Sequence, residues 1–164
     1  MPLGTRVWRE GIVTGLLGAA GVALWFFVVD VVSGTPLATP EMLGRVMFGV
    51  LGIGIPVEAW ANIVGYTAAH LVAFLLVGTI LSVVVDISHR IPVVLAGLLL
   101  LFVMMEVGFF GLTLLFSQSA EWTGLAWYHV SAANLVAAGL MGAYLWREHP
   151  GLASRFAKVL DGRI

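Results

Sequence analysis

The stretch VVLAGLLLLFVMMEVGFFGLTLLF, residues 93–116, decides the fold of this chain. It carries a single formal charge, Glu106, near its middle. A helix of roughly 20 apolar residues crosses a hydrocarbon core of about 30 Å, and the core helices of soluble domains are seldom so long and so uniformly apolar. We therefore predict a transmembrane helix over 93–116. Because an isolated charge in lipid is costly, we expect Glu106 to face polar groups on neighbouring helices.

The composition places the whole chain among integral membrane proteins. Of its 164 residues, 60% are hydrophobic and 10% are charged, and the mean hydropathy is +1.04. In soluble domains about a quarter of the residues carry a charge. The chain has no cysteine, which excludes disulfides, thiolate metal sites and cysteine nucleophiles. We predict one membrane domain over residues 1–164.

Three further apolar stretches complete a predicted all-α fold, an integral membrane four-helix transmembrane bundle. They cover about residues 11–32, 58–85 and 122–146. Between the first two, Thr39-Pro40-Glu41 is typical of a helix start with Thr39 as the N-cap. We therefore predict a short interfacial helix over about 40–50 in the first outer loop. Residues 147–164 form the predicted cytoplasmic tail.

The distribution of basic residues predicts how the bundle lies in the membrane. Seven of the eight fall on the side that holds both termini and the turn after the second span, while Arg45 falls on the other side. By the positive-inside rule, both termini are then cytoplasmic. Trp8 and Trp146 are predicted to mark the inner interface, and Trp60 and Trp122 the outer one.

Three ionisable side chains on three predicted spans fall at a similar depth in the outer half of the membrane. These are His70, Glu106 and His129, when each helix rises about 1.5 Å per residue. Other polar residues are predicted to lie in or near the same layer, namely Asp30, Tyr66, Thr67, Tyr128 and Asn134. The pattern therefore predicts a buried polar cluster shared by the four spans.

Three interpretations of this cluster remain open. In the first, the polar groups satisfy one another and fix the register of the bundle. In the second, His70, Glu106 and His129 bind a transition metal, or His70 and His129 are the axial ligands of a b-type haem. In the third, the same residues form a proton or ion path.

Sequence motifs of enzymes are absent from the chain. It has no glycine-rich phosphate loop, no Gly-x-Ser-x-Gly, no His-Glu-x-x-His and no basic aromatic surface for nucleic acid. The pairs Gly11/Gly15 and Ala138/Gly142 instead have the small-xxx-small spacing that lets helices approach closely. For Gly11/Gly15 we favour packing inside the bundle over a dimer face.

From these features we predict a non-enzymatic membrane subunit or accessory protein. It would pack in the lipid bilayer as a homo-oligomer or with other membrane protein subunits. A haem- or metal-binding membrane protein with a redox function is the alternative.

Four strings in the sequence carry a resemblance to known proteins. They are ALWFFVVD at 23–30, GTPLATP at 34–40, YTAAH at 66–70 and GAYLWR at 142–147. On these strings the chain resembles a group of small four-span bacterial membrane proteins over most of its length. That group has no established activity, so the resemblance implies a bacterial inner-membrane location and no particular chemistry.

Overall fold

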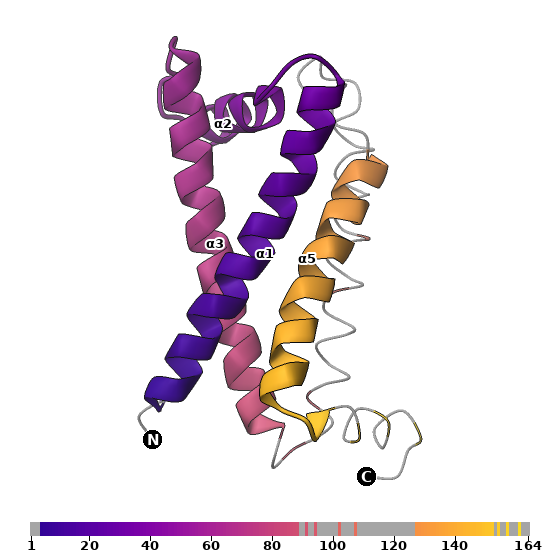
Figure 1. Cartoon of the computed structure of the whole chain (residues 1–164). Coiled ribbons are helices and arrows are strands. Elements are labelled where there is room, and N and C mark those ends of the chain that lie inside the picture. Colours follow the sequence, from indigo (N-terminus) through magenta and orange to yellow (C-terminus); the bar gives the residue numbers. More distant parts are fainter. Residues whose placement is uncertain are drawn as a thin grey trace.

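The computed structural model describes residues 4–88, 91, 94, 102, 107, 127–152, 154, 157 and 161. Within these ranges the chain is all-α, with four helices and no strand: α1 (Thr5–Val32), α2 (Ala38–Val50), α3 (Ala59–Ile87) and α5 (Trp127–Glu148). Figure 1 shows α1, α3 and α5 as long rods, with the short α2 at one end of the molecule. The predicted all-α class is confirmed for this part. Glu106, Trp122 and most of the stretches 93–116 and 153–164 lie outside the described residues.

Two of the described helices, not four, are long and apolar enough to cross a membrane. These are α1 with 28 residues and α3 with 29. Helix α5 has 22 residues and therefore the length, but it does not have the hydropathy. His129, Ser131 and Asn134 interrupt its apolar sequence, and many of its other residues are alanine or glycine. The predicted third span is not described.

Helices α1 and α3 cross with their backbones in contact. Gly11 and Gly15 of α1 lie against the backbone of α3 around Gly78. A Cβ atom on Gly15 would lie 2.5 Å from the carbonyl oxygen of Phe74, and one on Gly11 would lie 2.7 Å from the Cα of Thr79. A side chain at either position would therefore force the helices apart. The Gly11/Gly15 pair is used inside the chain.

Helix α5 packs on another side of α1. Val22 and Phe26 of α1 form a buried cluster with Val130, Ala133 and Ala137 of α5. Contacts between α1 and α3 and between α1 and α5 are extensive, whereas the described residues of α3 and α5 touch little. Helix α1 is thus the central element of the described bundle.

Helix α2 begins earlier than the sequence predicts. Its N-cap is Leu37, which has a left-handed backbone conformation with φ of 68°, and the helix starts at Ala38. The prediction that Thr39 is the N-cap is therefore wrong. The Leu37 side chain makes no capping hydrogen bond. The backbone of Gly44 lies directly on that of Asn62, so α2 packs against the first turns of α3.

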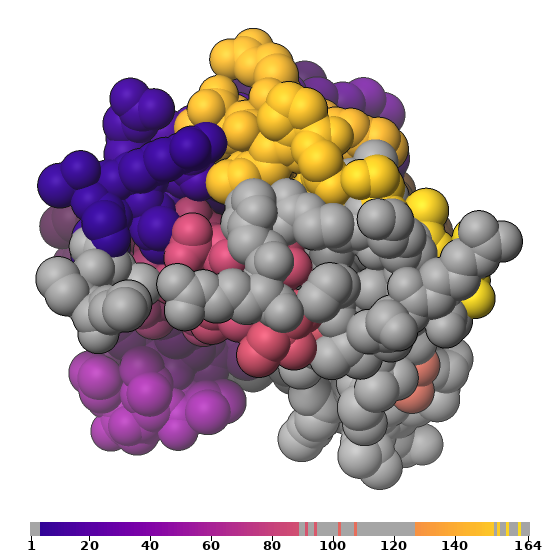
Figure 2. All heavy atoms as spheres, turned by 90° about the horizontal axis from the view of Figure 1, so that it is seen from below, coloured from indigo at the N-terminus to yellow at the C-terminus, as the bar shows by residue number. Residues whose placement is uncertain are grey.

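The first turn of α1, the last turn of α3 and the last turn of α5 lie at the same end of the molecule (Figure 1). Figure 2, a view of that end, shows atoms of all three helices close together. Arg6 Nη2 donates a hydrogen bond to the carbonyl oxygen of Glu148 at 3.2 Å, which ties the start of α1 to the end of α5. Helix α2, which carries Arg45, lies at the opposite end (Figure 1).

The backbone contact predicts that Gly15→Ala destabilises the protein. Its Cβ would overlap the backbone of α3, and overpacking of this kind costs about 1–3 kcal/mol. The control is Gly139→Ala on α5, where a Cβ would meet open space. Thermal unfolding in a mild detergent should show a lower midpoint for Gly15→Ala and an unchanged midpoint for Gly139→Ala. Equal midpoints for the two variants would contradict the crossing.

Candidate functional site

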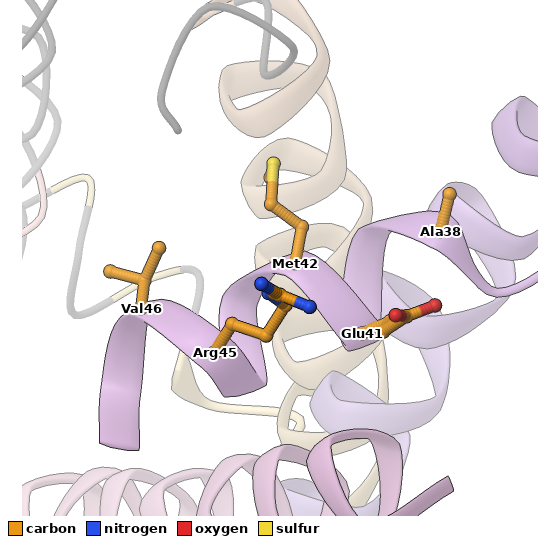
Figure 3. Close-up of a pocket in the computed structure, with 5 residues that line it drawn as sticks. All are labelled: Ala38, Glu41, Met42, Arg45 and Val46. Atoms are coloured by element: carbon orange, nitrogen blue, oxygen red, sulfur yellow. The ribbon is translucent and has the colours of Figure 1, made fainter. Parts of the chain in front are cut away.

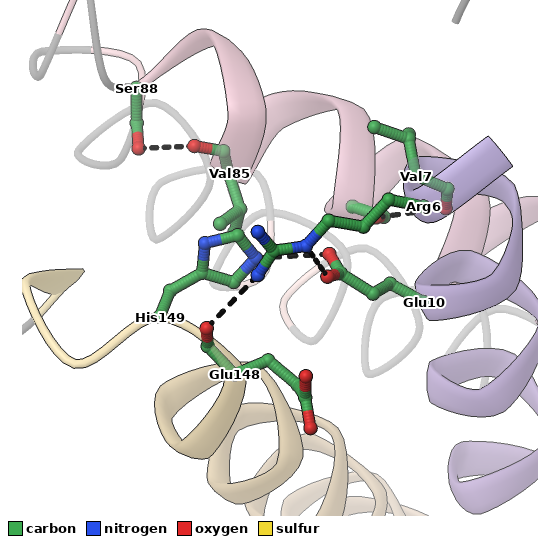
Figure 4. A network of polar contacts seen from close by, with 8 residues as sticks. Arg6, Val7, Glu10, Val85, Ser88, Glu148 and His149 are labelled. Carbon is green, nitrogen blue, oxygen red and sulfur yellow. Dashed lines mark hydrogen bonds and ion pairs between the residues drawn. The ribbon is translucent and has the colours of Figure 1, made fainter. Parts of the chain in front are cut away.

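The most deeply buried charge lies at the end of the bundle where α1, α3 and α5 meet. Glu10 is 1% exposed. Its Oε1 accepts a hydrogen bond from Arg6 Nε at 2.6 Å, and its Oε2 lies 2.9 Å from His149 Nε2 (Figure 4). Because a carboxylate only accepts hydrogen bonds, Nε2 of His149 carries the proton in this contact. Both oxygens of Glu10 are thus engaged within the chain.

Two serines of α3 at this end of the bundle donate hydrogen bonds to backbone carbonyls. Ser82 Oγ donates to the carbonyl oxygen of Val7 at 3.1 Å, and this bond joins α3 to α1. Ser88 Oγ donates to the carbonyl oxygen of Val85 at 2.6 Å and closes the last turn of α3 (Figure 4). The Ser82 bond, together with the contacts of Arg6, Glu10 and His149, holds the ends of three helices together. The arrangement is suited to fixing the register of the bundle.

A second buried carboxylate, Asp30, ties α1 to α2. Asp30 is 4% exposed, and its Oδ2 accepts a hydrogen bond from the backbone N–H of Thr39 at 2.9 Å. Its Oδ1 accepts from the Thr39 hydroxyl at 2.6 Å. A carboxylate at the first turn of a helix satisfies an otherwise free N–H and interacts favourably with the helix dipole. Asp30 therefore caps α2 from the end of α1.

His70 lies on α3 and contacts the middle of α1. Its Nε2 is 3.3 Å from the carbonyl oxygen of Ala19. A carbonyl only accepts, so Nε2 donates this bond, and in a neutral ring Nδ1 is left as an acceptor. The ring packs between Tyr66 and Phe74, with centroid distances of 5.6 and 4.7 Å.

His129 lies at the start of α5 beside two aromatic residues. The centroid of its ring is 6.3 Å from that of Trp25 and 4.5 Å from that of Tyr128. Its Nδ1 is buried and has no hydrogen-bond partner among the described residues, and the same holds for Nε1 of Trp25. A buried polar atom without a partner costs free energy, so this pair marks a place where a bound group or a water would stabilise the protein.

The described contacts do not join the two histidines. His70 meets α1 at Ala19 and His129 meets it at Trp25, positions about 9 Å apart along a helix and about 120° apart around it. No group of three His, Cys, Asp or Glu side chains that could hold a metal is found in the described part of the chain. Glu106 lies outside that part, so the predicted His70–Glu106–His129 metal site and the ion path stay predictions.

The other residues of the predicted cluster are dispersed. Thr67 Oγ1 donates to the carbonyl oxygen of Ile63 in its own helix at 2.7 Å. Tyr128 is exposed, and Tyr66 stacks on His70. Asn134 is partly buried on α5. Asp30 binds Thr39 rather than any of these side chains.

Two hollows adjoin α2. One, with a volume of about 340 Å³, is lined on the described side by Ala38, Glu41, Met42, Arg45 and Val46 (Figure 3). All five of these described residues belong to α2. The other, about 130 Å³, lies between α1, α2 and α3 and includes Tyr66 and His70 in its lining.

Glu10, whose two carboxylate oxygens each contact another side chain, was not predicted as a site residue. A signal was present, since Arg6 and Glu10 are four residues apart and therefore lie on one face of the helix. The contact of Glu10 with His149 spans 139 positions in the sequence. No local pattern indicates a pairing of that range.

Comparison of the chain with protein-family models, with curated proteins and with solved structures gives no match. The resemblance on the four strings quoted above therefore stays a prediction.

The Glu10 network predicts a graded response to substitution. Glu10→Ala leaves the N–H of buried His149 without its acceptor, and we expect it to lower the free energy of unfolding by about 1–3 kcal/mol. Arg6→Ala should cost less, because the Arg6 side chain is 62% exposed and its partners can be hydrated. Chemical unfolding in detergent measures both effects.

Arg9→Ala is the matched control, since Arg9 is an exposed basic residue on the same turn of α1. A double variant, Glu10→Ala with His149→Ala, should cost less than the sum of the two single changes. Strict additivity would mean that the two side chains do not stabilise each other.

Proposed function

We propose that this chain is a non-enzymatic integral membrane protein, a subunit or accessory protein that associates with other membrane helices through α5. In this proposal α5 and the stretch 93–116 complete a bundle of four spans, and both termini lie in the cytoplasm of a bacterium. The observation that carries the proposal is that polar side chains are buried and large apolar side chains are exposed, the reverse of the distribution in a soluble protein.

The largest fully buried side chains of the described residues are polar, namely Glu10, Asn62, Thr14, Ser82 and Ser88. Large apolar side chains are exposed along all three long helices: Ile12, Leu16, Leu24, Phe27 and Val28 on α1, Val64, Leu71, Val72, Leu76, Val77 and Ile80 on α3, and Leu135, Val136 and Leu140 on α5. Soluble monomers rarely expose a continuous apolar surface of this extent. Lipid or other apolar helices are the environment that such a surface fits.

Exposed tryptophans support the inclusion of α5 among the spans. Trp127 and Trp146 lie at its two ends and are 53% and 59% exposed. At 1.5 Å per residue they are about 28 Å apart along the axis. A hydrocarbon core is about 30 Å thick, and tryptophan is enriched at its two borders. The length of α5 therefore matches a membrane, although its hydropathy is lower than that of α1 and α3.

We place the association face on α5 because small residues are exposed on the surface of this helix. Ala138, Gly139 and Gly142 are exposed, and a Cβ on either glycine would meet no atom of the described residues within 4 Å. Gly11 and Gly15, in contrast, are covered by α3. Small residues on an open helix face let a second helix approach closely in a membrane. Among the described residues nothing covers the Ala138/Gly142 pair, whereas α3 covers Gly11 and Gly15.

Cysteine cross-linking in native membranes tests this face directly, because the natural chain has no cysteine. If α5 meets α5 of a second copy, Gly142→Cys and Ala138→Cys should form disulfide-linked dimers on mild oxidation. If α5 meets a different subunit, the same variants should link to a band of another mass.

Leu24→Cys and Val72→Cys are the controls, because these positions are exposed on α1 and α3. They should give little cross-linked product. Equal cross-linking at all four positions would indicate random collision, and no product at Gly142 or Ala138 would exclude α5 as the association face.

A second candidate function, binding of a redox cofactor, is favoured by one observation. The Nδ1 of His129 is buried and has no partner in the part of the chain that the structure describes. An imidazole nitrogen is a common ligand of haem iron and of transition metals. His70 is also suited to coordination, since donation from Nε2 to a carbonyl fixes the ring and leaves Nδ1 as the electron-pair donor.

Absorption spectroscopy and metal analysis of the purified protein test this candidate. We expect either a Soret band or a stoichiometric metal, and its loss in His129→Ala. A colourless and metal-free protein would exclude it. His129→Phe is a useful second variant, because it keeps an aromatic ring beside Trp25 and removes the two ring nitrogens.

A further inference from the structure

We propose that the cavity between α1, α2 and α3 binds a lipid-soluble molecule with a single phenolic ring, such as an alkylphenol or a quinol head group. This inference goes beyond the proposed subunit function; it rests on the membrane location proposed there and not on the α5 association face. It rests on the size of the cavity, the chemistry of its walls and the hydrogen-bonding capacity that its polar residues leave unused.

The cavity has the size of one aromatic ring. Its volume is about 130 Å³, and an apolar cavity of about 150 Å³ in a protein is known to hold benzene. Apolar side chains from all three helices or their flanks form most of the wall, including Val22 and Phe26 of α1, Ile63 of α3, and Leu37 and Pro40 at the start of α2. A flat ring fits this space, whereas a fused ring system is too large for it.

Two polar groups in the lining have hydrogen-bonding capacity to spare. The Tyr66 hydroxyl has no hydrogen-bond partner among the described residues and is available as a donor. His70 uses Nε2 on Ala19, so its Nδ1 remains as an acceptor. The two rings are neighbours, with centroids 5.6 Å apart. One donor and one acceptor side by side match a hydroxyl group, which accepts one hydrogen bond and donates another.

The cavity is closed on one side by α2, and Asp30 holds that side in place. Thr39, which lines the cavity, donates two hydrogen bonds to the Asp30 carboxylate, one from its backbone N–H and one from its hydroxyl. Since Thr39 lies between Leu37 and Pro40 in this wall, the two bonds fix all three residues. Asp30 is therefore a positioning residue for the cavity.

A route into the cavity is available from the lipid. Ala23, Phe27 and Thr67 belong to its lining and are also exposed on the surface of the helices. The helices that carry them, α1 and α3, diverge toward α2 (Figure 1). A molecule dissolved in the bilayer can therefore reach the ring-sized space sideways, with an alkyl tail left among the lipid chains.

The chemistry favours a phenol over the acyl chain of a phospholipid. An acyl chain would fill the volume but leave the Tyr66 hydroxyl and the His70 Nδ1 without partners. Sites that present hydrogen-bonding groups to a hydroxyl discriminate against analogues that lack it. The comparison of a phenol with its hydrocarbon analogue is therefore decisive.

The experiment measures binding of 4-hexylphenol and of hexylbenzene to the full chain in lipid nanodiscs, by equilibrium dialysis against empty nanodiscs. We expect saturable binding of 4-hexylphenol above the partitioning into lipid, and binding about tenfold weaker for hexylbenzene because the hydrogen bonds are lost. Tyr66→Phe keeps the ring and removes the hydroxyl, and it should weaken 4-hexylphenol binding about five- to tenfold.

A matched pair of variants tests the location. Ala23→Leu places a larger side chain in the lining and should abolish binding, whereas Ala20→Leu makes the same change on the exposed surface of α1 and should have no effect. Circular dichroism and gel filtration show whether Ala23→Leu is folded. If it is not, the loss of 4-hexylphenol binding in Tyr66→Phe tests whether the ligand occupies this cavity.

Two results would overturn the proposal. The first is the absence of saturable 4-hexylphenol binding to the natural chain. The second is equal binding of 4-hexylphenol and hexylbenzene with no effect of Tyr66→Phe, which would assign the cavity to a lipid acyl chain. Neither result bears on the α5 association face, which is read out by cross-linking in a separate experiment.

Discussion

The rest of the structure depends on the backbone contact between α1 and α3 at Gly11, Gly15 and Gly78. Two long helices that touch at one point must diverge away from it, and here they diverge toward α2 (Figure 1). Helix α2 lies at the open end of the angle, and the ring-sized cavity lies between the three helices. A larger residue at the crossing would change the angle and with it the cavity.

Hydrogen bonds at the two ends of α1 fix the register of the helices, in addition to the glycine contact between α1 and α3. In a membrane, apolar packing alone discriminates poorly between helix registers, because lipid chains are as apolar as the side chains. Glu10 with Arg6 and His149 fixes one end of α1, and Asp30 with Thr39 fixes the other. Both carboxylates accept a hydrogen bond at each oxygen, so each links two parts of the chain.

The sequence predicts elements better than it predicts partners. The apolar runs placed α1 and α3, and the spacing of Gly11 and Gly15 indicated a close helix contact, because both signals are local. The start of α2 was misplaced because its cap comes from Asp30, nine residues earlier, and not from Thr39 itself. The rise per residue predicts the depth of His70 and His129 in the bundle, but it does not predict the direction in which each side chain points around its helix. The rings consequently meet α1 on different faces.

The cavity and the proposed association face lie on different sides of α1 but share its packing. Val22 and Phe26 line the cavity and also belong to the buried cluster that holds α5 on α1. The neighbouring Trp25 reaches His129 at the start of α5. Since these three side chains come from one turn of α1, the shape of the cavity and the position of α5 are set by the same rotamers. Close-packed side chains transmit small displacements, so α1 is the element through which the two sides of the molecule are mechanically connected.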